Sequence, residues 1–171
     1  MIGVGKTTLL RTLAGLQPAT SGAVDGADDS AYSSHADGIK TALSVVENLA
    51  FWADIYGQSV PDTVYEAFDL VDLKTRLAGT LSAGQKRRLG LARLGVIDRK
   101  VLFLDEPTVS LDAASVALFA EAVSIHCAAG GIALAATHIE IGLPEGPRIE
   151  IAPPSERTAD EGDPFLTGAW S

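Results

Sequence analysis

The chain has 171 residues and a formal net charge of −9 at pH 7, a length that suits one domain with a sizeable core rather than two ordinary domains. The acidic balance would repel phosphate backbones, which argues against nucleic acid as a partner of the whole chain. Cys127 is the only cysteine, which excludes an internal disulfide. Hydrophobic residues make up 47% of the chain, but no apolar run approaches the roughly 20 residues that span a bilayer.

Helical and strand-like segments alternate along the chain. The helices, recognised by apolar residues at helical spacing, are predicted over residues 6–16, 44–56, 62–77, 82–97 and 112–129. The strands, recognised by short apolar runs between turn residues, are predicted over residues 22–25, 30–35, 100–105, 132–137 and 147–151. This alternation is typical of an α/β fold with a mainly parallel sheet flanked by helices.

Capping residues mark several ends of the predicted helices. Ser44 and Glu47 have the spacing of a capping box, and Asp62 and Asp112 are predicted to cap the third and fifth helices. Gly130 is predicted to close the fifth helix. The prolines and acidic residues of 152–171 predict a loose tail. No signal peptide is visible at the start of the chain, so we expect a cytoplasmic location.

The first chemical motif is the segment 3–8, GVGKTT, which supplies the end of the phosphate-loop pattern G-x-x-x-x-G-K-[ST]. Backbone N–H groups at the start of the following helix would face an anion. Lys6 would reach the β and γ phosphates of a nucleotide and Thr7 would ligate Mg²⁺. A plain glycine turn before a helix is the alternative. The candidate nucleotide-binding residues here are Gly3, Gly5, Lys6, Thr7 and Thr8.

The second motif is the segment 101–106, VLFLDE, an apolar run that ends in two acids. It places Asp105 at the carboxyl end of a buried strand, where ligands bind in open α/β sheets. Asp105 suits a Mg²⁺ site, and Glu106 suits a general base that polarises the attacking water. An ordinary strand followed by a solvated acidic turn is the alternative.

The third motif, LSAGQ at residues 81–85, resembles the LSGGQ signature of the ABC-type ATPases. Its residues Ser82, Ala83, Gly84 and Gln85 stand at the start of a predicted helix and would offer hydrogen-bond donors to a γ phosphate. The resemblance continues in order along the chain. The segment 107–112, PTVSLD, is similar to the stretch that leads through the D-loop in that family, and it ends at Asp112. His138 matches the histidine that contacts the γ phosphate in that family.

This resemblance implies a P-loop NTPase fold whose ABC ATPase domain covers residues 1–151, with a helical subdomain at about 41–95. It implies ATP and Mg²⁺ as ligands and a second copy of the chain in a head-to-tail dimer closed around ATP. Relative to that family, the first glycine of the phosphate loop, its strand and the N-terminal β region would precede Met1. We therefore expect a chain that begins inside the phosphate loop.

One departure from the general ABC pattern indicates a particular subfamily of these ATPases. His35 stands where most members have a glutamine that contacts Mg²⁺, and the segment 32–52 around it resembles the heme exporter ATPases of cytochrome c maturation. That resemblance implies a peripheral ATPase on the cytoplasmic face of the bacterial inner membrane, working with membrane subunits similar to CcmB and CcmC. An ATPase of another small-molecule exporter, an inactive truncated fragment and an ABC ATPase acting on DNA or ribosomes are the alternatives.

Two further groups of side chains can be interpreted as structural, without a role in binding or catalysis. The basic residues that follow the signature are expected to form a solvated helix face that stabilises the helix, and they are Lys86, Arg87, Arg88 and Arg93. The aromatic residues of the second helix could pack in the core or anchor a membrane partner, and they are Phe51, Trp52 and Tyr56.

Overall fold

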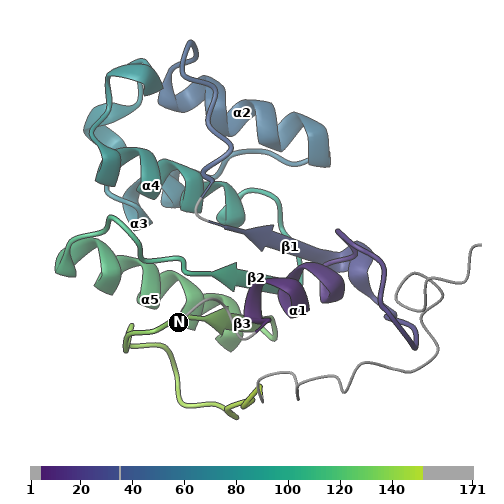
Figure 1. The fold of residues 1–171 in the computed structure, drawn as a ribbon. Helices are drawn as coiled ribbons and strands as arrows, with labels where there is room; N and C mark the ends of the chain where they lie inside the picture. Colours follow the sequence, from purple (N-terminus) through teal and green to yellow (C-terminus); the bar gives the residue numbers. More distant parts are fainter. Residues whose placement is uncertain (1–4, 35, 152–171) are drawn as a thin grey trace, which may run out of the picture.

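A three-stranded parallel sheet with the order β1-β2-β3 lies at the centre of the molecule (Figure 1). The computed structural model describes residues 5–34 and 36–151. The strands of this sheet are β1 (Ser30–Ser33), β2 (Val101–Asp105) and β3 (Ile132–Ala136). β2 is buried along most of its length, as its apolar sequence predicts for a central parallel strand.

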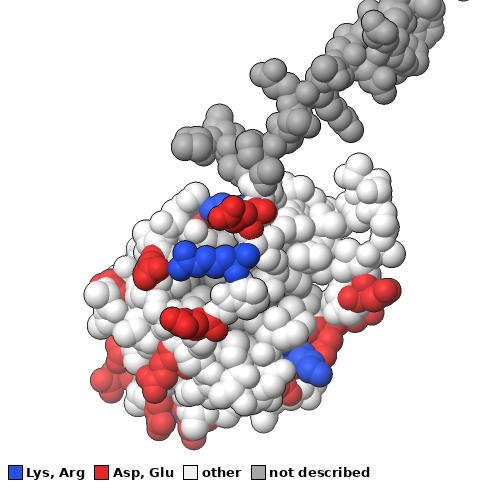
Figure 2. Space-filling view, turned by 90° about the horizontal axis from the view of Figure 1, so that it is seen from below, with Lys and Arg blue, Asp and Glu red and all other residues white. Residues whose placement is uncertain are grey.

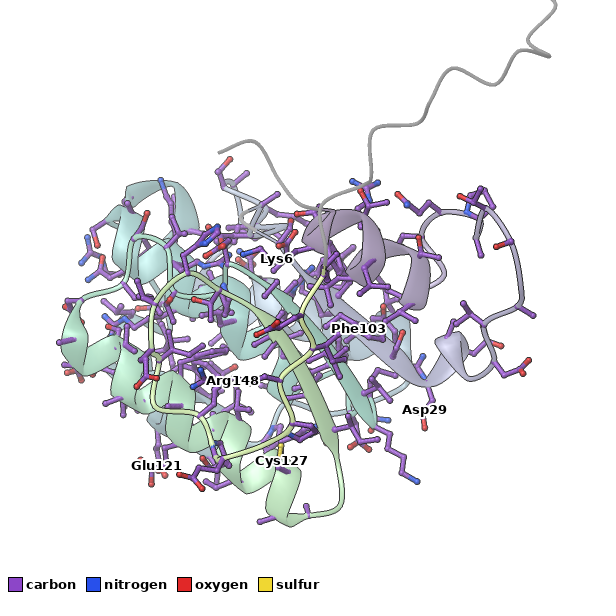
Figure 3. The ribbon with its side chains drawn as sticks, turned by 60° about the horizontal axis from the view of Figure 1, so that its bottom comes forward. Lys6, Asp29, Phe103, Glu121, Cys127 and Arg148 are labelled. Atoms are coloured by element: carbon purple, nitrogen blue, oxygen red, sulfur yellow. The ribbon has the colours of Figure 1, made fainter. Side chains whose placement is uncertain are left out.

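Helices cover both faces of the sheet. On one face, α1 (Lys6–Leu13) packs Leu10 against Phe103 of β2 and Ala136 of β3, and Figure 3 shows Phe103 beneath that helix. On the other face, Leu102 and Leu104 of β2 join the main hydrophobic core. Because successive strand residues point to opposite faces, the continuous apolar run of β2 serves both cores. The main core also receives side chains from α5 (Ala113–Ala128).

The remaining helices pack together beside the sheet, above β1 in the view of Figure 1. They are α2 (Val45–Tyr56), α3 (Asp62–Ala67) and α4 (Ala83–Ala92). Their buried residues, such as Leu49 of α2 and Leu91 of α4, belong to the same core as the sheet. Short 3₁₀ helices connect the elements at Ala27–Asp29, Val71–Leu73, Ala78–Thr80 and Arg93–Gly95.

The predicted fold class is confirmed, and so are the capping residues of two helices. Ser44 and Glu47 form both hydrogen bonds of a capping box at the start of α2. The carboxylate of Asp112 accepts a hydrogen bond from the backbone N–H of Ser115 and thereby caps α5. These contacts are local, which is why sequence spacing alone predicts them.

Three predicted helices are shorter than expected, and the first of them, predicted over 6–16, ends at Leu13. The predicted helix 62–77 ends at Ala67, because Asp69 adopts a left-handed conformation with φ 49° that a helix cannot continue. Its N-cap is Pro61 and no side chain caps it, so the prediction that Asp62 caps this helix is wrong. The predicted helix 82–97 is α-helical only to Ala92 and continues as a 3₁₀ turn.

Two predicted strands do not form. Residues 22–25 lie in a turn segment in which Gly22 and Gly26 both have left-handed φ angles. Residues 147–151 are described without regular structure. In residues 5–34 and 36–151, no helix has both the length and the apolar character needed to cross a membrane.

The buried side chain of Asn48 holds the segment that leads into α2. Its amide Nδ2 donates to the carbonyls of Lys40, Leu43 and Ser44, and its Oδ1 accepts from the N–H of Lys40 at 2.8 Å. We expect Asn48→Ala to lower the free energy of unfolding by about 2 kcal/mol, because it leaves these backbone groups without their partner. Urea unfolding checks this, with the exposed Thr63→Ala as control, and equal stability of both variants would contradict it.

Candidate functional site

The carboxyl ends of the three strands and the start of α1 meet at one edge of the sheet. Asp105 is the last residue of β2, Glu106 follows it, and His138 follows β3 by two residues. Gly5 and Lys6 begin α1 at the same edge, and Figure 3 shows Lys6 at that end of the helix. Parallel strands place their ends together, so this edge collects residues far apart in the sequence.

Three charged or titratable side chains converge there. The Nζ atom of Lys6 lies 3.2 Å from Nε2 of His138 and 3.9 Å from Oε1 of Glu106. The Nε2 atom of His138 lies 3.2 Å from the same oxygen of Glu106. The imidazole is 77% exposed, so the cluster opens to solvent. A cation, an imidazole and a carboxylate on one open edge can bind an anion and accept a proton beside it.

The backbone of Glu106 is held in an unusual conformation. Its φ is 47°, in the left-handed region that costs a residue with a side chain roughly 1–2 kcal/mol. Its N–H donates to the carbonyl of Ala136 in β3 at 2.8 Å, and its carbonyl accepts from Arg87 at 3.1 Å. Strain of this kind persists where surrounding contacts over-determine it and is common at functional sites.

Asp105 is almost fully buried, at 7% exposure, and its Oδ2 accepts a 2.9 Å hydrogen bond from the hydroxyl of Tyr32 in β1. Burial, and then this hydrogen bond, raise the pKa of Tyr32 to about 12. The hydroxyl therefore remains a donor at neutral pH and fixes the orientation of the Asp105 carboxylate. Sequence reasoning missed Tyr32, because nothing local relates it to a residue in another strand.

The start of α1 has no side-chain cap among the described residues. Gly5 is its N-cap with φ 88° and makes no side-chain hydrogen bond to the N–H groups of the first turn. Thr7 and Thr8 are exposed in that turn. The hydroxyl of Thr7 and the carboxylate of Asp105 are hard oxygen donors, a set that fits Mg²⁺. Within the described ranges, no group of three or more His, Cys, Asp or Glu side chains could hold a metal ion by itself.

The signature segment does not join this cluster within one chain. Ser82 and Gln85 form a capping box with each other, with Gln85 N–H donating to Ser82 Oγ at 3.2 Å. The start of α4 instead packs close to the loop after Glu106, where a Cβ at Gly84 would lie 3.3 Å from the carbonyl of Ser110. Ser82 and Ala83 are exposed. Asp112 caps α5, and the hydrogen bond from Ser115 lowers its pKa.

The expectation that Arg87 belongs to a solvated face is wrong. Its side chain is 3% exposed and makes an ion pair with Asp37 at 2.8 Å. A sequence signal was available, because Arg87 shares the helix face of Leu91 and Leu94, both buried. The predicted site residues Gly3 and His35 lie outside the residues that the structure describes.

Comparisons with known proteins agree with this geometry. The family model described as ABC transporter matches residues 2–109. A putative ABC transporter ATP-binding protein from Pyrococcus furiosus shares the fold, with a TM-score of 0.68 at 24% identity over 85% of this chain and 80% of that one. The cbiO1 structure from Clostridium perfringens has a TM-score of 0.64 at 25% identity, over 81% of this chain and 64% of that chain.

The sequence relatives are more similar. Those from Roseobacter denitrificans and Paracoccus denitrificans, each named cytochrome c biogenesis ATP-binding export protein CcmA, are both 59% identical over 152 residues. These alignments span 88% of this chain and 74% and 72% of the two relatives. The family match, together with the parallel sheet and its acidic strand end, thus assigns the chain to the ATP-hydrolysing nucleotide-binding domains of the ABC transporter class. Within that class, the chain belongs to the CcmA family.

Removing the hydroxyl of Tyr32 tests whether its hydrogen bond orients the carboxylate of Asp105. We expect Tyr32→Phe to lower the rate of ATP hydrolysis about tenfold, because a hydrogen bond to a carboxylate is worth roughly 1.5–3 kcal/mol and the carboxylate loses its fixed orientation. A steady-state phosphate-release assay measures this. Tyr56→Phe, which removes a hydroxyl from α2, is the control, and equal rates for the two variants would refute the role of the bond.

Proposed function

We propose that the chain is the ATPase subunit that powers heme export or delivery for cytochrome c maturation. It works at the cytoplasmic face of the bacterial inner membrane with membrane subunits similar to CcmB and CcmC. The convergence of Lys6, Glu106 and His138 at the sheet edge carries the ATPase half of this proposal. The names of the CcmA relatives support the cytochrome c half.

In this proposal some of the predicted site residues bind the phosphates and others bind Mg²⁺. Lys6, with the N–H groups after Gly5, binds the β and γ phosphates, supported by the uncapped start of α1. Thr7 and Asp105 hold Mg²⁺, which neutralises charge on the phosphate oxygens when bound. The further candidate nucleotide-binding residues are Gly3, Thr8, His35 and Asp112.

Hydrolysis then needs a base for the attacking water and a side chain that contacts the γ phosphate. A water oxygen forms a bond to the γ phosphorus, the bond from that phosphorus to the β–γ bridging oxygen breaks, and ADP leaves with the electron pair. Glu106 accepts one proton of the water, and His138 contacts the γ phosphate beside it. The products are ADP, inorganic phosphate and a proton. Most of the rate gain in such a site comes from positioning and charge stabilisation.

A second copy completes the site. Ser82 and Ala83 at the start of α4 are exposed, and no hydrogen bond among the described residues joins them to Lys6 of the same chain. In a head-to-tail dimer, Ser82, Ala83, Gly84 and Gln85 of one copy would cap the γ phosphate bound by the other. The domain in this proposal covers residues 1–151, and its helical subdomain, at about 41–95, faces the membrane subunits.

Two aromatic residues of α2 pack against the core, while an aliphatic residue of the same helix is exposed. Trp52 and Tyr56 pack against the main core and lie over one another with ring centroids 6.5 Å apart. Ile55 is 55% exposed and is an apolar side chain that a membrane subunit could cover. This favours core packing for Trp52 and Tyr56 and leaves the exposed side of α2 for the partner.

The role of Glu106 is tested by Glu106→Gln. We expect the rate of ATP hydrolysis to fall at least about a hundredfold while ATP still binds, because the amide keeps the shape of the side chain and cannot accept the proton. Phosphate release, equilibrium binding of ATP and size-exclusion chromatography measure the three properties, and the variant should accumulate as an ATP-bound dimer. Glu140→Gln on the exposed loop after β3 is the control. Normal hydrolysis by Glu106→Gln would show that the base lies elsewhere.

The cargo is tested in a bacterium whose own CcmA has been deleted. We expect the chain to restore heme-stained c-type cytochromes in the periplasm, whereas Lys6→Ala should not, since it loses its phosphate contact. Heme staining of separated periplasmic proteins is the measurement. Restoration by the Lys6→Ala variant would contradict a role for ATP, and wild-type hydrolysis without restoration would contradict the cargo.

A further inference from the structure

A buried cation lies behind the cluster of Lys6, Glu106 and His138. Arg87 stands in the middle of α4, and its side chain is 3% exposed. A buried guanidinium is costly unless every part of it is paired. Its five donors have a fixed planar arrangement, so the acceptors around it must be fixed as well.

The guanidinium ties together two loops that are far apart in the sequence. Its Nη1 donates to the carbonyl of Ser34 at 2.6 Å and to Oδ1 of Asp37 at 2.8 Å, both in the loop after β1. Its Nε donates to the carbonyl of Pro107 at 2.8 Å, and its Nη2 donates to the carbonyl of Glu106 at 3.1 Å. The acceptors therefore belong to the loop after β1 and to the loop after β2.

Asp37 can reach Arg87 because the neighbouring turn of α4 has no side chain. A Cβ at Gly90 would lie 2.7 Å from Cβ of Asp37 and 2.9 Å from its Oδ1. Glycine in a helix interior costs up to about 1 kcal/mol relative to alanine. At position 90 the absence of a side chain allows the loop after β1 to pack directly on α4.

The contact with Glu106 explains how its left-handed backbone is maintained. Its N–H is bound by Ala136 of β3 and its carbonyl by Arg87 of α4, so the peptide groups on either side of its Cα are both fixed. Fixing both peptide groups fixes the direction of the Cα–Cβ bond of Glu106, and from there its carboxylate reaches Lys6 and His138.

We infer that Arg87, with its partner Asp37, is a positioning residue that holds the backbone of Glu106 so that its carboxylate meets the attacking water. The inference rests on the proposed role of Glu106 as the base. Arg87 does not touch the nucleotide. It makes the position of the base depend on the loop after β1 and on the helix that follows the signature.

The test is a double-mutant cycle on the full chain, with kcat and ATP affinity measured for each variant. We expect Arg87→Met to lower kcat about tenfold while the Kd for ATP changes less than about threefold. In a Glu106→Gln chain, the same substitution should lower the residual rate less than about twofold, because the base through which it acts is gone. Arg88 lies on the same helix as Arg87, and Arg88→Met, which breaks the ion pair of Arg88 with Asp69, is the control and should leave kcat unchanged.

Asp37→Asn and Gly90→Ala give a second route should Arg87→Met fail to fold. Both disturb the partner of the guanidinium and should lower kcat about threefold with unchanged ATP affinity. An equal loss with and without Glu106, or a parallel loss of ATP affinity, would assign Arg87 a purely structural role and overturn the inference. If Glu106→Gln hydrolyses ATP normally, the proposed base fails. If that variant is inactive while Arg87→Met, Asp37→Asn and Gly90→Ala keep the wild-type kcat, only the inference fails.

Discussion

The parallel pairing of β2 with a strand on each side is the constraint on which the site depends. The register joins Tyr32 to Phe103 and Phe103 to Leu134. It thereby brings the carboxyl ends of all three strands to one edge, with Asp105 opposite Ala136. A slip of one residue would turn Asp105 to the other face of the sheet and break its bond with Tyr32. The two cores fix this register, because Phe103 fills one and its neighbours in β2 fill the other.

The chain is acidic overall, so the positive groups that would attract a nucleotide act locally. The net charge is −9, and Figure 2 shows acidic side chains spread around one face with few basic ones among them. A nucleotide triphosphate is itself strongly negative, so attraction must be local. In the proposed function it comes from Lys6 and from the N-terminal end of α1, whose effect reaches about one helical turn. Salt screens the more distant carboxylates over about 8 Å, which leaves the local donors to set affinity.

Sequence alone predicts the parts of this molecule that depend on neighbours in the chain. The capping box at Ser44 and the buried strand before Asp105 are examples. It does not predict that α3 ends at Ala67, where a left-handed residue stops a pattern that could have continued. The helix face of Arg87 indicates that it is buried, but the sequence does not predict its hydrogen-bond acceptors. Its acceptors come from the loops after β1 and β2, and only the assembled fold brings these loops together.

The contacts of Glu106 divide into those that can change and those that cannot. Its carboxylate touches Lys6 at 3.9 Å and His138 at 3.2 Å, both on the open side of the cluster. In the proposed mechanism a γ phosphate bound there competes for Lys6, because phosphate offers more charge than one carboxylate, and the side chain of Glu106 then exchanges partners as ATP binds. A base held only by such contacts would lose its position at that step. Its backbone hydrogen bonds involve Ala136 and Arg87 instead, so under the proposed mechanism they would keep the base in place while its side-chain partners change.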